Sequence, residues 1–224
     1  MLSRKTIVFA CLFMTLPLIW EPAISYGKTL PSVIVIDPGH GGIDSGTTAG
    51  SILEKDIVLS IGKDIAKQLE KDHVIVYMTR DQDKDASKLY PTPLKSRHRS
   101  DLLNRVRFFH EHAASMVISL HVNHSGSSST SGALVFYQRE QPFSTLYAPF
   151  LQDTLNTFYT AKQRPLTGPY YILRAAHVPV FLLEIGFLSN PSDREKLTNP
   201  VWQHSFATSM TKAIELGLAF QWNR

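Results

Sequence analysis

Short apolar runs alternate along this chain with segments whose apolar residues recur at helical spacing. The run Val33–Ile36 is continuous and β-branched, which is typical of a strand buried on both faces. Residues 56–70 instead predict a helix, because their apolar side chains repeat every four residues at Ile57, Ile61, Ile65 and Leu69.

The same patterns predict the rest of the domain. Strands are expected at 74–78, 116–120, 133–137, 170–173 and 180–183, and helices at 97–112, 143–159 and 200–218. Polar stretches rich in Ser, Gly or Pro predict loops at 81–96 and 125–131. This alternation predicts a three-layer α/β/α fold with a mostly parallel central sheet of about six strands.

The first 25 residues have the pattern of an export signal. Arg4 and Lys5 precede the apolar run Ile7–Trp20, and the small-residue pattern Ala23-Ile24-Ser25 follows it. The run is short for a membrane span and contains Pro17, so a cleaved signal is favoured over an anchor through residues 7–20. We therefore divide the chain into a signal peptide or membrane anchor, 1–25, and a folded domain, 26–224, that acts outside the cytoplasm.

Composition narrows the chemistry of any site. The chain has 43% hydrophobic and 19% charged residues, which is typical of a globular protein. Its formal net charge of +4 comes without a run of like charges, and no nucleic-acid-binding motif is present. The single cysteine, Cys11, lies inside the N-terminal apolar run, so any metal in the mature domain must be held by His, Asp or Glu.

The motif Asp37-Pro38-Gly39-His40-Gly41-Gly42 begins where the first predicted strand ends. Ligands of open α/β sheets bind beyond the carboxyl ends of the strands, and glycines let the backbone approach a ligand closely. His40 is therefore a candidate site residue. The alternative interpretation is a glycine-rich turn with an incidental histidine.

His121 follows a second predicted strand, in the motif Ser119–Asn123. Two histidines at two strand ends can bind one zinc ion, and a catalytic zinc usually has three protein ligands and one open position. Glu54 is the favoured third ligand because it precedes a predicted helix and follows a glycine-rich loop. Spacing alone places it only slightly ahead of Asp44 and Asp56.

Glu184 closes the strongly apolar strand 180–183. A carboxylate there is costly to bury without a partner, and near a metal it could act as a general base. A solvated carboxylate at a strand end is the alternative. Among the other histidines, His124 and His177 are candidates for substrate contact, and we expect surface positions for His73, His98, His110, His112 and His204.

Taken together, the motifs resemble the zinc-dependent N-acetylmuramoyl-L-alanine amidases of bacteria, from Val33 to about Leu218. The resemblance rests on Asp37–Gly42, Glu54–Asp56, Thr79–Arg80, Arg97, Asp101, Arg105, Ser119–Asn123 and Glu184–Asn190. It implies zinc on His40, Glu54 and His121, and a catalytic Glu184. It also implies a substrate, peptidoglycan, cut at the amide between the lactyl group of muramic acid and L-alanine.

Within the family, Gly132–Tyr137 and Gly168–Leu173 resemble the germination-specific amidases of the spore cortex. That likeness implies a role in muramic-lactam formation, in the space around the developing forespore. His110 and Ser115 depart from the usual family pattern, at positions that do not bind zinc. A vegetative cell-wall amidase, a zinc carboxypeptidase acting on the peptide stem and a non-catalytic wall-binding module are the alternatives. Candidate partners beyond peptidoglycan are an activating lipoprotein and a second copy of this chain.

Overall fold

A computed structural model describes residues 32–222, so the predicted signal peptide or anchor and Cys11 lie outside the described residues. The strands are β1 (Val33–Pro38), β2 (Thr48–Ala49), β3 (Ile52–Leu53), β4 (Ile75–Met78), β5 (Met116–Asn123), β6 (Leu134–Tyr137), β7 (Leu166–Thr167) and β8 (Val180–Phe187). The helices are α1 (Glu54–Lys71), a 3₁₀ turn η1 (Ala86–Lys88), α2 (Arg97–Glu111), α3 (Pro142–Asn156), α4 (Tyr171–Ala175), α5 (Pro191–Thr198) and α6 (Pro200–Trp222).

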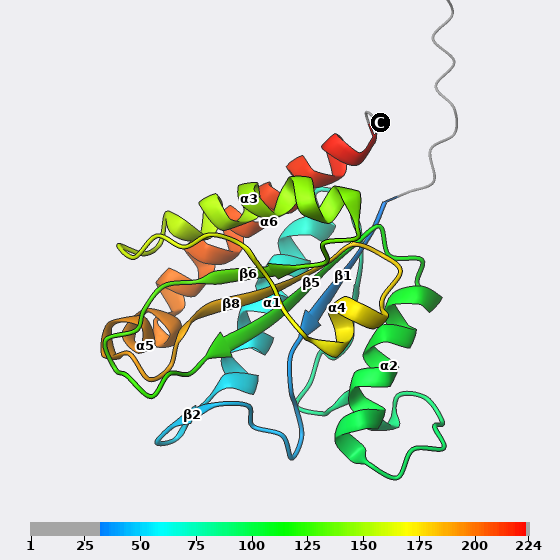
Figure 1. Ribbon diagram of the computed structural model, residues 1–224, viewed down its shortest axis with the longest axis horizontal. Helices are drawn as coiled ribbons and strands as arrows, with labels where there is room; N and C mark the ends of the chain where they lie inside the picture. The colour runs from blue at the N-terminus through cyan, green and yellow to red at the C-terminus, as the bar shows by residue number, and fades with distance from the viewer. Residues whose placement is uncertain (1–31, 223–224) are drawn as a thin grey trace, which may run out of the picture. The chain divides into compact units, whose positions relative to one another are not determined.

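Six strands form the central sheet in the order β4-β1-β5-β8-β6-β7 (Figure 1). The neighbours β4, β1, β5 and β8 are mutually parallel, and β6 runs antiparallel to β8. The short strand β7 pairs in parallel with β6, and β2 and β3 form a separate two-stranded ribbon. The prediction of a mostly parallel sheet of about six strands is confirmed.

Alternate side chains of the sheet pack into two cores. Ile34 and Ile36 of β1 belong to the core beneath α1, α3 and α6, whereas Val35 belongs to the core beneath α2 and α4. A strand covered on both faces must be apolar at successive positions, which is why the continuous run at 33–36 predicted a buried strand. Helices therefore cover both faces, and the three-layer expectation is confirmed (Figure 1).

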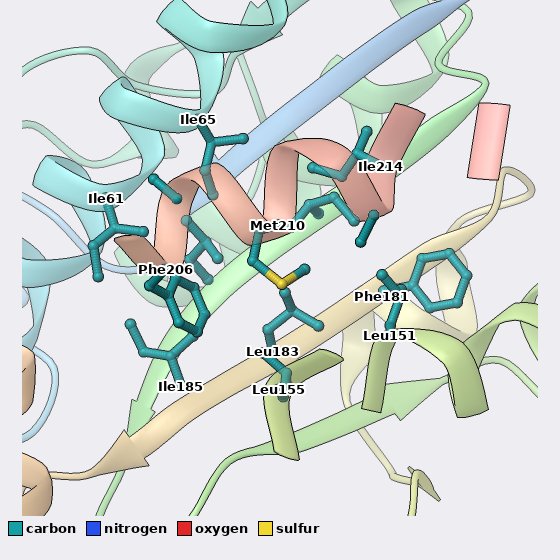
Figure 2. Close-up of a cluster of buried hydrophobic side chains, with 14 of the residues drawn as sticks. Ile61, Ile65, Leu151, Leu155, Phe181, Leu183, Ile185, Phe206, Met210 and Ile214 are labelled. Carbon is teal, nitrogen blue, oxygen red and sulfur yellow. The ribbon is translucent and has the colours of Figure 1, made fainter. Parts of the chain in front are cut away.

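The larger core packs helices α1 and α6 tightly against the sheet. Figure 2 shows Ile61 of α1 near Phe206 and Met210 of α6, with Leu183 and Ile185 of β8 beneath them. All five side chains are fully buried. Burying a side chain of this size stabilises the fold by about 1.5–3 kcal/mol. The packing of this core therefore holds in place the strands that carry the candidate site.

Residues 170–173, predicted as a strand, are the one element of the wrong type. Tyr171–Ala175 is the short helix α4, and β7 takes the sixth place in the sheet. Ile172 and Leu173 are buried against the sheet in the smaller core. A four-residue apolar run serves equally well as a strand or as one buried helical turn, so the pattern alone could not separate them.

Two boundaries bear on the site. β5 continues to Asn123 and β8 to Phe187, so His121 and Glu184 lie within strands instead of after them. The helix predicted from 56 begins at Glu54, which is therefore its first residue. Within residues 32–222, no helix is both long and apolar enough to cross a membrane.

Candidate metal centre

His40 lies in the turn that leaves β1, in an unusual backbone conformation. Its φ angle is +60°, a region that residues other than glycine rarely adopt, and Gly41 and Gly42 follow with φ angles of +125° and +59°. The turn directs Nε2 of His40 toward the other site residues. Its Nδ1 atom lies 3.1 Å from a carboxylate oxygen of Asp44. A carboxylate on the second ring nitrogen is the usual way in which a metal-binding histidine is oriented.

Glu54 is held at the start of α1 as a buried carboxylate. The backbone N–H of Val122 donates to its Oε1 at 2.8 Å, and that of Thr47 donates to its Oε2 at 2.7 Å. Burial alone would raise the pKa of Glu54, but hydrogen bonds with His121 and His40 outweigh it and hold the pKa well below its usual range. The group is therefore an anion, as a carboxylate ligand must be.

His121 completes the cluster from β5. Its Nδ1 atom lies 3.1 Å from Oε1 of Glu54 and 3.2 Å from Nε2 of His40, and His40 Nε2 lies 3.1 Å from the same Glu54 oxygen. The structure thus brings together the three residues predicted as ligands. Their ligand atoms lie close enough to one another to hold one metal ion.

The donor set and its spacing fit zinc. Two imidazole nitrogens and one carboxylate oxygen are a known zinc combination, with bonds of about 2.0–2.2 Å. Tetrahedral bonds of that length place neighbouring ligand atoms about 3.3–3.6 Å apart. The three separations of 3.1–3.2 Å are close to this range. Three protein ligands also leave the fourth position open to a reactant.

Glu184 lies beside the cluster on the neighbouring strand. It occupies the register position opposite His121 in the parallel pair β5–β8. The residue is only 8% exposed, and its Oε2 atom has no hydrogen-bond partner among the described residues. Burial raises the pKa of Glu184 to about 7. A buried, unpaired carboxyl group with a pKa near neutrality is suited to accept and return a proton.

All four residues line one cavity of about 440 Å³. Its wall also contains Leu102 and His98 of α2, together with Asn123, His124, Tyr170, Tyr171, Ile172 and Leu182. A larger cavity, of about 910 Å³, contains none of the four and includes His177, Arg139 and Arg174. The smaller cavity is the site, because it alone combines the metal-ligand cluster with a perturbed carboxyl group.

The remaining histidine predictions are mixed. His124 lines the site cavity, where its Nδ1 lies 3.1 Å from Oγ1 of Thr47, whereas His177 stacks on His110 away from it. His98 was expected at the surface, and it is exposed but also lines the cavity. Tyr170 and Tyr171 also line the cavity, at the start of the helical turn α4. Neither was predicted as a site residue, because their run was expected to form a strand.

Known proteins resemble this chain over most of its length. Residues 34–216 match the family model described as N-acetylmuramoyl-L-alanine amidase. The germination-specific N-acetylmuramoyl-L-alanine amidase of Bacillus subtilis (strain 168) is 34% identical over 184 residues, which cover 81% of this chain and 78% of that protein. The amidase LytC of the same strain is 28% identical over 180 residues, covering 79% of this chain and 34% of LytC.

A solved structure shares the fold. The CwlD amidase from Clostridioides difficile, in complex with the GerS lipoprotein, superposes with a TM-score of 0.77 at 28% identity. The match covers 84% of this chain and 99% of that one. The similarity therefore extends over nearly the whole of that chain.

Proposed function

This chain belongs to the family of N-acetylmuramoyl-L-alanine amidases, and we propose that it works as a zinc enzyme on the peptidoglycan of the spore cortex. The observation that supports the zinc chemistry best is the convergence of three ligand atoms within 3.2 Å of one another. In this proposal His40, Glu54 and His121 hold the metal, and Glu184 is the catalytic residue.

The reaction breaks the amide between the lactyl carbonyl of N-acetylmuramic acid and the amine of L-alanine. When bound, zinc supplies Lewis-acid activation of a carbonyl oxygen and of water. Glu184 takes a proton from the attacking water and delivers it to the departing amine. Its buried, unpaired Oε2 can accept that proton, and its pKa of about 7 makes both transfers accessible near neutral pH.

The cavity wall gives the substrate a defined place. Leu102, Ile172 and Leu182 provide apolar surface beside the carboxylate, and Tyr170 and Tyr171 add aromatic rings. Small apolar groups of the substrate, such as the methyl groups of the lactyl unit and of L-alanine, suit such a surface. Exclusion of water there also strengthens the electrostatic interactions of Glu184.

One observation favours the spore cortex as the place of action. A relative with 34% identity is named as germination-specific. In this proposal the enzyme is exported to the space around the developing forespore. There it removes peptides from muramic acid so that muramic lactam can form. The complex of the solved relative with GerS makes a lipoprotein the kind of partner to test first.

A vegetative cell-wall amidase is the second candidate, because LytC, a relative with 28% identity, is named as an amidase without reference to germination. Expression in a Bacillus subtilis strain that lacks its germination-specific amidase separates the two. Restored muramic lactam in the cortex would support the cortex role. Unchanged cortex, together with new muramic acid residues that lack a peptide in vegetative walls, would favour the second candidate.

The amide cleavage itself is tested on purified peptidoglycan, with zinc and with a chelator. We expect released peptides that begin with a free L-alanine amine, and no release in the chelated sample. Shortened stems still attached to muramic acid would identify a carboxypeptidase instead. Binding to the wall without cleavage in the presence of zinc would favour a non-catalytic binding module.

A further inference from the structure

Two buried arginines bond to three successive carbonyl groups in the turn that carries His40. Arg80 donates from Nε to the carbonyl oxygen of Pro38 at 2.9 Å and from Nη2 to that of Gly39 at 2.8 Å. Arg105 donates from Nη1 to the same Pro38 oxygen at 3.0 Å and from Nη2 to that of His40 at 2.7 Å. The two side chains are 2% and 3% exposed.

These bonds fix the peptide planes on both sides of His40. The carbonyl of Gly39 belongs to the plane before His40, and the carbonyl of His40 belongs to the plane after it. The orientations of those two planes determine φ and ψ of His40, which has the unfavourable φ of +60°. A strained conformation of this kind persists only where the surroundings impose it. The two guanidinium groups impose it here.

Arg80 also ties this turn to the first turn of α1. Its Nη2 donates to the carbonyl oxygen of Lys55 at 2.7 Å, and Lys55 directly follows Glu54. One guanidinium therefore bonds to the backbone beside two of the three ligand residues. Only a planar group with several donors in fixed directions can serve these carbonyls together.

The two arginines differ in how their charge is compensated. Arg105 bonds to the carboxylates of Asp37 and Asp101, whereas each hydrogen bond that the structure shows for Arg80 ends on a carbonyl oxygen. Burial, and after it the positive charge of Arg105, lowers the pKa of Arg80 to about 10. Burying a cation on neutral acceptors is costly, and a neutral side chain would serve packing at lower cost.

We propose that Arg80 and Arg105 are positioning residues for the metal centre, which hold His40 and Glu54 face to face before the ion binds. The inference rests on the proposed metal site. It also gives a reason for the motifs Thr79–Arg80 and Arg105, which are not among the proposed metal ligands.

The test compares the variants Arg80→Lys and Arg107→Lys, each made in the full chain. Arg107 is the matched control because it lies on the surface of α2, paired with Glu111. Zinc affinity is measured by competition with a chromophoric chelator, and the geometry of the site by the visible spectrum of the Co²⁺-loaded protein. The melting temperature of the metal-free protein reports folding separately.

We expect Arg80→Lys to raise the zinc dissociation constant by about 10- to 100-fold, the usual effect of losing a group that orients ligands. Its Co²⁺ spectrum should also change, and Arg107→Lys should match the parent in both. Should Arg80→Lys fail to fold, Asp101→Asn replaces it, since it weakens the orientation of Arg105 without removing either arginine. Asp101→Asn should also raise the zinc dissociation constant.

The outcomes separate this inference from the function on which it rests. A folded Arg80→Lys protein with parental zinc affinity and spectrum would overturn the positioning role, and a lower melting temperature alone would mean a merely structural one. In both cases the amidase and its zinc site would stand. If the parent chain itself bound no zinc, the proposed metal site would fail, and the positioning role with it.

Discussion

The imidazole of His121 occupies the space in which residue 39 would carry a side chain. A Cβ atom added to Gly39 would lie 2.3 Å from Cε1 of that ring, well inside van der Waals contact. The N–H of Gly39 also donates to the carbonyl of Leu120 at 2.9 Å, so the backbone cannot easily move away. Gly39 is therefore required by the ring of a proposed ligand residue, and not only by the turn.

We accordingly predict that Gly39→Ala displaces His121 and raises the zinc dissociation constant at least about 10-fold. Gly126→Ala is the matched control, because a Cβ there meets nothing within 4 Å. Zinc per mole of folded protein, measured by elemental analysis after gel filtration, checks both variants. Stoichiometric zinc at parental affinity in Gly39→Ala would contradict the packing argument.

Glu184→Gln should keep zinc and lose catalysis. The amide cannot take up the proton of the attacking water, and loss of a general acid–base group lowers kcat by about 10² or more. Rates of peptide release and bound zinc are measured on the same preparation. Asn123→Ala, in the same cavity but without an ionisable group, serves as the comparison. Near-parental hydrolysis by Glu184→Gln would contradict the role of Glu184 as the general acid–base residue.

The apolar pattern predicted most of the fold because both faces of the sheet are covered. Continuous runs such as Val33–Ile36 then mark the buried strands directly. The prediction of a strand was wrong at 170–173, where Ile172 and Leu173 bury against the sheet from a helical turn. His121 was predicted to follow its strand. It lies within β5 instead, because β5 continues beyond its apolar run where it pairs with β8.

The site was predictable in its residue types but not in its third ligand. Glu54 and Asp44 both lie near His40, on Nε2 and Nδ1 respectively. Which carboxylate faces the metal depends on how the turn folds back, and the N–H of Thr47 and of Val122 hold Glu54 in place. Such long-range backbone contacts leave no local signal. Family resemblance favoured Glu54, and the geometry now supports the same choice.

Stability in acid should depend on Asp37. Burial opposes ionisation of this carboxyl group, but the charge of Arg105 and hydrogen bonds from Thr79 and Ser119 outweigh it and lower the pKa below 3.8. A lowered pKa in the folded state contributes stability that is present above pH 3.8 and is lost as the pH falls through the folded value.

Denaturant titrations between about pH 5 and about pH 2 test this dependence. Asp37→Asn should flatten the fall in the free energy of unfolding. It should also cost about 3–5 kcal/mol at neutral pH, because Arg105 loses a buried partner. Asp153→Asn, at an exposed position of α3, should leave the curve unchanged. An equally steep fall in Asp37→Asn would assign the acid sensitivity to other groups.

Core stability and metal binding should be separable. Phe206 of α6 is fully buried, and Figure 2 shows it near Ile61 of α1 and Ile185 of β8. Phe206→Ala should lower the free energy of unfolding by about 3–5 kcal/mol through lost burial and a cavity. Val201→Ala on the same helix is 79% exposed and should change it by less than about 0.5 kcal/mol. Both proteins should bind zinc with parental affinity below their melting temperatures.

Removal of the metal should cost stability without unfolding the domain. None of the three proposed ligands belongs to either hydrophobic core, so the chelated protein should keep its far-ultraviolet circular dichroism. An ion that binds only the folded state stabilises it by about 2.7 kcal/mol at a free concentration 100 times its dissociation constant. Adding zinc should therefore raise the melting temperature of the parent and restore peptide release. His40→Ala should show neither effect, because it lacks one of three ligands. A zinc-dependent rise in its melting temperature equal to that of the parent would place the stabilising metal at a different site.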